Sequence, residues 1–238
     1  MNWLDDKINN TEGFSSFISN FDANKRSSIT FVNPFSYFKL IDDEKFKGFF
    51  DAVYIDGISL VRLHNFRFNS KVARTSFDFS SIAHDVFHFA QSNDMTIAIV
   101  GSTDEELEIF KTNLSKMYPK IKIGYSHSGY FDETKKIEIF EELEDSLAEI
   151  LIVGMGTPYQ ENFIFDLFHF SSSKFIAFTC GGFISQTAIK ADYYHPLVKK
   201  LGLMWLQRAF LHSHVRKRLV VDYPKFFIKY CYRAIFNK

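Results

Sequence analysis

The stretch Ile150-Leu-Ile-Val-Gly-Met-Gly-Thr-Pro-Tyr-Gln-Glu-Asn-Phe-Ile164 decides the fold of this 238-residue chain. Its apolar run, Ile150 to Val153, ends at a Gly154-x-Gly156 turn. A proline follows, and then a helical pattern over residues 160–170. Glycines let a backbone approach a ligand closely, and the unpaired N–H groups of a helix N-terminus attract phosphates. The stretch therefore predicts a strand, a glycine turn and a helix that together form an anion site.

The glycine pair alone is a weak signal for a nucleotide. The full dinucleotide fingerprint needs a third glycine and a later acidic residue that binds the ribose, and neither is evident here. The extension Thr157-Pro158-x-Gln160-Glu161 makes the segment distinctive.

The rest of the chain alternates between strand and helix patterns. Strands are expected at residues 29–32, 52–55, 95–100, 120–125, 150–153 and 174–179. Helical patterns are expected within residues 35–50, from 58, and at 82–90, 103–116, 133–147 and 160–170. Thr103 and Glu106 form a capping box for the fourth of these. Such alternation predicts an α/β fold, a Rossmann-like and mostly parallel sheet flanked by helices.

Ligands of parallel sheets bind in the crevice beyond the carboxyl ends of the strands. Several candidate site residues follow expected strands, and together they could line one crevice: Asp56, Gly101, Tyr130, Gly154, Gly156, Gly181 and Gly182.

The composition is that of a globular protein, with 46% hydrophobic and 24% charged residues. The length fits one large domain, or one domain with an appendage. Cys180 and Cys231 offer no disulfide framework, which favours a reducing compartment. The chain shows no signal-peptide pattern and no apolar run of the roughly 18 residues that a membrane span needs. We therefore expect a cytoplasmic location.

A net charge of zero hides a strong asymmetry. Residues 199–238 carry ten Lys or Arg residues against one acidic residue, Asp222, so this end has a charge of +9 and the remainder −9. Aromatic residues are mixed with these cations. We expect residues 1–197 to form the α/β domain and residues 198–238 a basic, helical C-terminal appendage. Such a segment suits an anionic membrane surface, but it could equally be a helix with a solvated basic face and an aromatic core face.

Seven segments of the sequence resemble the WecG/TagA/CpsF glycosyltransferases, in that family's order and at about its spacings. They are Phe31-Val-Asn-Pro34, Tyr54-Ile-Asp-Gly-Ile-Ser-Leu-Val61, Arg74, Ser128-Gly-Tyr-Phe131, Val153-Gly-Met-Gly-Thr-Pro-Tyr-Gln-Glu161, Gly181-Gly182 and Leu201-Gly-Leu-Met-Trp-Leu-Gln-Arg208. The most specific are the segment Val153–Glu161 and the Asp-Gly-Ile-x-x-Val pattern that begins at Asp56.

This resemblance implies an inverting transferase that moves a sugar, an N-acetylhexosamine or a hexose, from a UDP-sugar to a polyprenyl-diphosphate-linked sugar. The product would enter cell-surface polysaccharides such as capsule, exopolysaccharide or cell wall. The enzyme would be peripheral on the inner face of the bacterial plasma membrane. A homo-oligomer is compatible with the sequence, and no nucleic-acid partner is expected, because only the charge of the tail favours one.

The resemblance also assigns roles to individual residues. Asp56 would be the general base that deprotonates the acceptor hydroxyl, and Arg74 would help the departing diphosphate. The donor-binding set would be Asn33, Tyr130, Gly154, Gly156, Gln160, Glu161, Gly181 and Gly182. The acceptor and membrane set would be Arg208, Arg216 and Arg218.

The residues alone allow plainer interpretations. Asp56-Gly57 is a common turn dipeptide, and Arg74 could be a surface cation. In so aromatic a chain, Tyr130 could simply pack. Gly181-Gly182 could be a tight turn without a ligand.

Several positions depart from the family pattern. Phe31 stands where many members carry Thr, Ser185 where Asp is usual, and Met204 where Glu precedes Trp205. The family's Arg-Ala-Pro is replaced by Tyr194-His195-Pro196. These departures motivate an alternative, a catalytically lapsed scaffold that binds nucleotide sugars.

Neither a metal nor another cofactor is expected. His84 and His88 lie four apart on a helical pattern, but a third ligand at suitable spacing is not evident. The chain contains no Asp-x-Asp that could hold a divalent ion on a diphosphate. Arginine side chains, backbone N–H groups and a helix dipole would then have to stabilise the leaving group.

Overall fold

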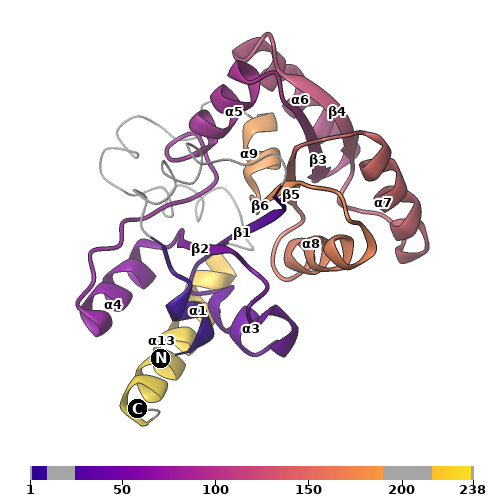
Figure 1. Ribbon diagram of the computed structural model, residues 1–238. Helices are drawn as coiled ribbons and strands as arrows, with labels where there is room; N and C mark the ends of the chain where they lie inside the picture. Colours follow the sequence, from indigo (N-terminus) through magenta and orange to yellow (C-terminus); the bar gives the residue numbers. More distant parts are fainter. Residues whose placement is uncertain (1, 10–24, 190–215, 237–238) are drawn as a thin grey trace.

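The computed structural model describes residues 2–9, 25–189 and 216–236. Six strands form one sheet in the order β2-β1-β6-β5-β3-β4, and every pairing between them is parallel (Figure 1). The strands are β1 Ser27–Val32, β2 Ala52–Ile55, β3 Thr96–Gly101, β4 Lys122–His127, β5 Ile150–Gly154 and β6 Ile176–Thr179. The predicted Rossmann-like α/β fold is confirmed.

Helices follow most strands. They are α1 Trp3–Asp6, α3 Tyr37–Ile41, α4 Ile58–Phe68, α5 Ala83–Ser92, α6 Asp104–Met117, α7 Lys136–Asp145, α8 Tyr159–Phe170, α9 Phe183–Ile189 and α13 Tyr223–Phe236. Short 3₁₀ turns lie at Glu44–Phe46 and Glu133–Lys135, and a π-helical segment, Arg218–Asp222, leads into α13. The side chain of Thr103 accepts a hydrogen bond from the N–H of Glu106, so the predicted cap of α6 forms.

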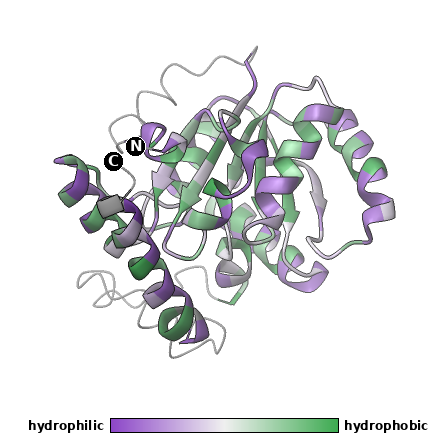
Figure 2. Cartoon of the chain, turned by 90° about the horizontal axis from the view of Figure 1, so that it is seen from below, coloured by the Kyte–Doolittle hydropathy of each residue, from purple (hydrophilic) through white to green (hydrophobic). Residues whose placement is uncertain are grey.

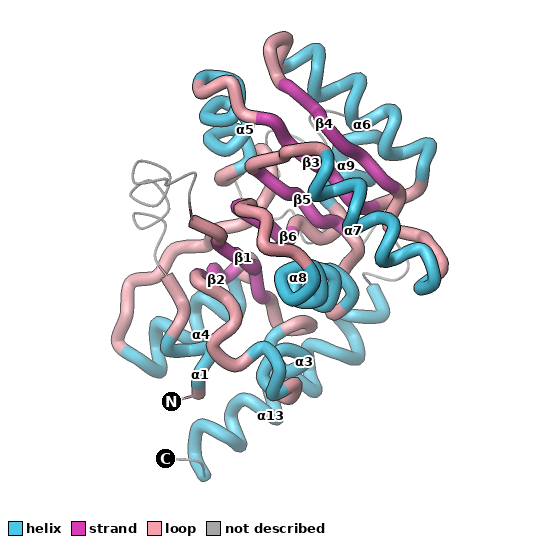
Figure 3. Tube along the Cα trace, turned by 45° about the vertical axis from the view of Figure 1, so that its right-hand side comes forward, coloured by secondary structure: helices cyan, strands magenta, loops and turns pink. Residues whose placement is uncertain are grey.

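Strand β5 lies inside the sheet and is buried along its whole length. Ile150 and Ile152 face a core shared with α5, α6 and α9, whereas Leu151 and Val153 face a core shared with α7 and α8. The continuous apolar run follows from this burial on both faces. Figure 3 shows the two helical layers on opposite sides of the strands.

A third core cluster covers the β1–β2 end of the sheet and brings both ends of the chain together. Leu4 of α1, Leu40 of α3 and Leu60 of α4 pack with Phe226 and Tyr230 of α13. Figure 1 shows α13 beside α1 and α3. Figure 2 shows mainly hydrophobic strands inside, between helices that carry both hydrophobic and hydrophilic residues. The C-terminal helix is therefore docked on the sheet domain. The proposed boundary at residues 197 and 198 lies outside the described residues and stays a prediction.

Two helices were not predicted. Helix α1 is a single turn capped by Asn2, whose side chain accepts hydrogen bonds from the N–H groups of Leu4 and Asp5. Helix α9 begins directly after Gly181-Gly182, where the sequence indicated only the end of a strand. Within the described residues, no helix combines the length and apolar character needed to cross a bilayer.

Candidate active site

A pocket of about 470 Å³ lies at the carboxyl edge of the sheet. Residues that follow each of the six strands line it, so the strand ends converge as the alternation predicted. Nine of the predicted residues are among the lining: Asn33, Asp56, Arg74, Tyr130, Gly154, Gly156, Gln160, Gly181 and Gly182. The volume falls within the roughly 300–1,000 Å³ typical of small-molecule sites.

Of the other predicted residues, Glu161 and Arg216 are described and do not line this pocket. Glu161 is fully buried beneath it. Arg216 is exposed at the start of the C-terminal segment. Arg208 lies outside the described residues, as do Met204, Tyr194, His195 and Pro196. The position of the Arg218 side chain is likewise outside what the structure describes.

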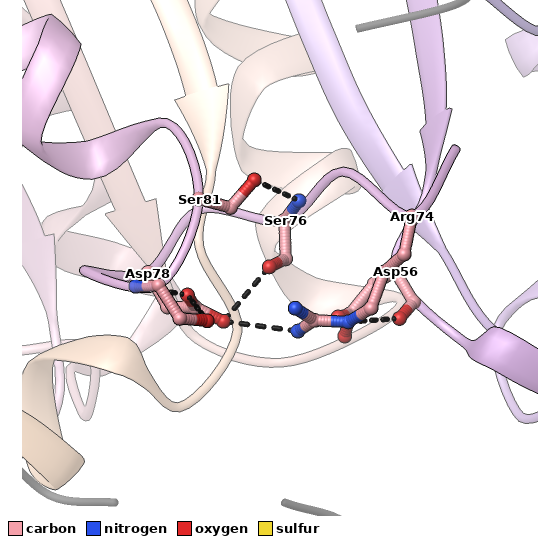
Figure 4. Close-up of polar contacts among 6 residues, drawn as sticks. Asp56, Arg74, Ser76, Asp78 and Ser81 are labelled. Carbon is pink, nitrogen blue, oxygen red and sulfur yellow. Dashed lines mark hydrogen bonds and ion pairs between the residues drawn. The ribbon is translucent and has the colours of Figure 1, made fainter. Parts of the chain in front are cut away.

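Arg74 joins two carboxylates at one end of the pocket (Figure 4). Its Nη2 donates to Asp56 Oδ1 at 2.7 Å and to Asp78 Oδ2 at 3.0 Å. Its Nε donates to the backbone carbonyl of Asp56 at 2.7 Å. The planar guanidinium thus holds both the side chain and the backbone of Asp56. In this geometry Arg74 positions Asp56, a role that the sequence did not suggest.

Asp78 was not identified from the sequence. It also accepts hydrogen bonds from Ser76 Oγ at 2.8 Å and from the N–H of Ser80 at 2.7 Å. Burial opposes ionisation of Asp78, but the charge of Arg74 and these hydrogen bonds outweigh it and lower its pKa below the ordinary value. Burial alone would lower the pKa of Arg74, yet Asp56 and Asp78 raise it. The arginine and Asp78 are therefore both charged at neutral pH.

The neighbouring strand end fixes the turn that carries Asp56. The N–H of Asp56 donates to the carbonyl of Val32 at 2.9 Å. A Cβ atom on Gly57 would lie 2.8 Å from Pro34 Cδ, so only glycine allows the two turns to pack this closely. The side-chain oxygen of Asn33 accepts hydrogen bonds from the N–H groups of Phe35 and Ser36 and thereby closes its own turn. Asn33 and Gly57 together set the position of Asp56.

The two glycine turns meet in the middle of the pocket. A Cβ atom on Gly154 would lie 2.9 Å from Cys180 Sγ and 3.1 Å from the carbonyl oxygen of Gly181. The side-chain oxygen of Gln160 accepts a hydrogen bond from the N–H of Gly181 at 3.0 Å, which ties the start of α8 to the turn after β6. This region presents backbone groups and a helix N-terminus to the pocket, which suits a phosphate.

Glu161 supports these turns from below. Its Oε1 accepts hydrogen bonds from Gln160 Nε2 at 2.9 Å, Thr157 Oγ1 at 3.0 Å and Thr30 Oγ1 at 3.4 Å. Burial raises the pKa of Glu161 above its ordinary value, despite those hydrogen bonds. This position favours support of the donor turns over direct contact with a ligand. Its donor-binding role stays a prediction.

The opposite end of the pocket carries a polar cluster, of which the sequence singled out only Ser185, as a departure from the family pattern. Ser102 follows β3, Glu106 lies in the first turn of α6, and Ser185 lies on α9. The sequence marked Glu106 only as part of a helix cap. Tyr130, after β4, borders the same end and is 79% exposed.

The histidine pair forms other contacts. His84 Nδ1 is hydrogen-bonded to Tyr118 Oη at 2.5 Å, and His88 Nδ1 is 3.4 Å from Ser92 Oγ. In the described parts of the chain, no group of three His, Cys, Asp or Glu residues is placed to hold a metal ion.

Comparison with known proteins identifies the family. The model of the glycosyl transferase WecG/TagA/CpsF family matches residues 4–238. The chain belongs to the WecG/TagA/CpsF family. It is a glycosyltransferase, and the resemblance seen in its motifs is confirmed.

Named relatives agree with this assignment. One, 44% identical over 209 residues and covering 87% of both chains, is a UDP-Gal:alpha-D-GlcNAc-diphosphoundecaprenol beta-1,4-galactosyltransferase of Shigella boydii. Two others are N-acetylglucosaminyldiphosphoundecaprenol N-acetyl-beta-D-mannosaminyltransferases. The Bacillus subtilis (strain 168) protein is 25% identical, over 83% of this chain and 76% of its own length. The Staphylococcus aureus (strain MRSA252) protein is 30% identical, over 51% of this chain and 47% of its own.

Proposed function

We propose that this WecG/TagA/CpsF protein is an inverting, metal-independent glycosyltransferase that moves a hexose from a UDP-sugar to a polyprenyl-diphosphate-linked sugar. The product serves the assembly of a cell-surface polysaccharide. The observation that carries this proposal is the carboxylate of Asp56, held by Arg74 at the edge of a pocket whose glycine turns suit a diphosphate.

The relatives support a more specific choice of substrates. The names of all three describe an acceptor made of N-acetylglucosamine linked to diphosphoundecaprenol. The Shigella relative, similar over most of both chains, is named for UDP-Gal and a β-1,4 linkage. We therefore take UDP-galactose as the first donor to test, with N-acetylglucosaminyl-diphosphoundecaprenol as acceptor.

Asp56 acts as the general base in this mechanism. Its carboxylate takes the proton of the acceptor hydroxyl while that oxygen forms a bond to the anomeric carbon of the donor sugar. The bond between the anomeric carbon and the β-phosphate oxygen breaks, and UDP leaves with the electron pair. Attack opposite the leaving group inverts the configuration. Arg74 keeps Asp56 in place.

The donor diphosphate lies against the turns of Gly154–Gly156 and Gly181-Gly182. Backbone N–H groups and the N-terminus of α8 stabilise the charge that develops on UDP, and no metal ion is required. Gln160 keeps the two turns together through its hydrogen bond with Gly181.

The enzyme works as a peripheral protein on the cytoplasmic face of the membrane. The +9 charge of residues 199–238 attracts anionic lipid, and exposed apolar side chains of α13, such as Ile228 and Tyr232, favour an interfacial position. This arrangement brings a lipid-linked acceptor to the pocket.

Release of UDP tests the proposal. Protein, UDP-galactose and N-acetylglucosaminyl-diphospholipid should yield UDP and a disaccharide lipid, with EDTA present. Asp56→Asn should lower kcat by about 10²–10⁴-fold, the usual contribution of a general base, and should leave UDP binding intact. Asp145→Asn, at an exposed position on α7, is the matched control and should keep full activity.

Three outcomes would contradict all or part of the proposal. Full activity of Asp56→Asn would remove the assigned base. UDP binding without turnover across a panel of UDP-sugars would favour the lapsed scaffold suggested by Phe31, Ser185 and Met204. Loss of activity with EDTA, restored by a divalent ion, would overturn metal independence alone.

A further inference from the structure

The polar cluster at the far end of the pocket consists of Ser102, Glu106 and Ser185. Ser102 Oγ and Ser185 Oγ both donate to Glu106 Oε2, the latter at 2.8 Å, and the two hydroxyls are 2.7 Å apart. All three residues line the pocket. The carboxylate is therefore held towards the cavity by two side chains that can rotate to suit a ligand.

This cluster is far from the proposed base. Asp56 follows β2, at one edge of the sheet, and Ser102 follows β3, four strands away. At about 4.8 Å between neighbouring strands, the separation is roughly 19 Å. A single sugar ring cannot reach both places. With the anomeric carbon near Asp56 and the diphosphate on the glycine turns between, the cluster faces the nucleoside.

The charge of Glu106 restricts what it can bind. Burial opposes its ionisation, but hydrogen bonds from Ser102 and Ser185 outweigh this and lower the pKa of Glu106. An anion in a pocket for a diphosphate repels the phosphates. It is useful there only if it accepts hydrogen bonds from the O–H or N–H groups of the ligand.

We propose that Glu106, supported by Ser102 and Ser185, binds the 2′- and 3′-hydroxyls of the donor's ribose. Oε2 already accepts from both serines, so Oε1 is the oxygen that accepts from one ribose hydroxyl, and a serine oxygen accepts from the neighbouring one. Acidic residues bind ribose hydroxyls in other parallel sheets. The exposed ring of Tyr130, at the rim of the pocket, offers the nucleobase an aromatic face on which to stack. The sequence offered no obvious acidic ribose ligand, and helix α6 supplies one. This inference rests on the proposed UDP-sugar donor.

Deoxynucleotides test the ribose contact directly. Calorimetry on the full chain should show that UDP binds about 10- to 100-fold more tightly than 2′-deoxy-UDP or 3′-deoxy-UDP, as expected for a hydrogen bond to a charged group. Glu106→Gln should weaken UDP binding by a similar factor and leave binding of 2′,3′-dideoxy-UDP, which lacks both hydroxyls, within about threefold of the wild type. Glu105→Gln, an exposed neighbour in the same helical turn, is the control and should behave as wild type.

Each other result would overturn the ribose assignment. Equal binding of UDP and both deoxynucleotides by the wild-type protein would show that no contact to the diol exists. An equal loss of UDP and 2′,3′-dideoxy-UDP in Glu106→Gln would assign the carboxylate to the base or to the fold, and melting curves would separate these. If the enzyme turns over UDP-galactose but binds UDP and the deoxynucleotides equally, only the ribose subsite is contradicted. Failure of the wild type to bind UDP at all removes the proposed donor as well.

Discussion

Arg74 is the residue on which the geometry of the proposed base depends. It contacts Asp56 through both backbone and side chain, and it shares its charge with Asp78. Lysine could supply the charge, but not the fixed pair of donors, Nε and Nη2, that reach the backbone carbonyl and the carboxylate of Asp56 together. Asp78 holds the same Nη2 atom that contacts the carboxylate of Asp56, although Asp78 follows no strand.

Asp78 should contribute to stability in a pH-dependent way. Its folded-state pKa is lowered, so its contribution is complete above the unfolded pKa of about 3.9 and disappears as the pH falls through the folded value. Asp78→Asn should cost about 1.5–3 kcal/mol of unfolding free energy at pH 7, because hydrogen bonds to a charged group are lost. Denaturation at pH 7 and at pH 3 measures this. A cost that is equal at both pH values would contradict the assigned ionisation.

Sequence reasoning found the residues that follow strands and missed those placed by the tertiary structure. Asp56 and Gly154 occupy turns whose position the strand pattern predicts. Asp78 lies in a loop, and Glu106 is hidden within a helix cap, so their approach to the pocket depends on packing that no local pattern encodes. The burial of Glu161 could not be predicted for the same reason. The sequence does not show which residues at the start of a helix face a pocket and which lie beneath it.

At the scale of elements, α13 uses two different kinds of contact. Phe226 and Tyr230 are buried against Tyr37, with ring centroids 5.6 Å apart in both pairs. One turn along the same face, Lys229 and Arg233 pair with Asp42 at 2.5 and 3.0 Å. The aromatic core face considered for the tail is thus present, and two tail cations face the protein body.

The aromatic contacts should dominate the docking of this helix. Phe226→Ala should cost about 3–5 kcal/mol, as is typical when a buried Phe is truncated. Asp42→Asn should cost at most about 1 kcal/mol, since its ion pairs are partly exposed. Urea denaturation of both variants gives the comparison. A larger loss for Asp42→Asn than for Phe226→Ala would mean that charge, not packing, holds α13.

Strands were easier to predict than short helices. The run Ile150–Val153 reads as a strand because it is buried on both faces. Helix α9 has seven residues and α1 four, too few for a helical period to stand out from the sequence. Both place residues in the core, and α1 is also capped by Asn2.

For the whole molecule, the charge asymmetry predicts an orientation. Arg216 and Lys217 are exposed at the start of the C-terminal segment, on the flank that α13 covers. Ile228 and Tyr232, 73% and 61% exposed, lie on the face of α13 opposite Phe226 and Tyr230. We expect this flank to meet the membrane.

Vesicle binding checks this orientation. Lys217→Glu should weaken binding to vesicles rich in phosphatidylglycerol by at least about fivefold, at roughly 1 kcal/mol per charge near the surface. Lys120→Glu makes the same change in net charge beside β4, at the other edge of the sheet, and should have little effect. Equal losses in co-sedimentation would indicate a nonspecific effect of net charge, and no loss in either would contradict the tether.

The edge position of β2 affects how substrates enter the site and how products leave it. Among the described residues β2 is the last strand of the sheet, and only the bridge between Ile8 and Val53 lies beyond it, so Asp56 stands at a flank and the donor turns stand at the middle. A lipid-linked acceptor can then reach Asp56 from the β2 edge of the sheet, while the nucleotide binds and leaves along the carboxyl ends of the central strands. Acceptor and nucleotide then use different entrances to the pocket, so UDP can dissociate while the glycosylated lipid is still bound.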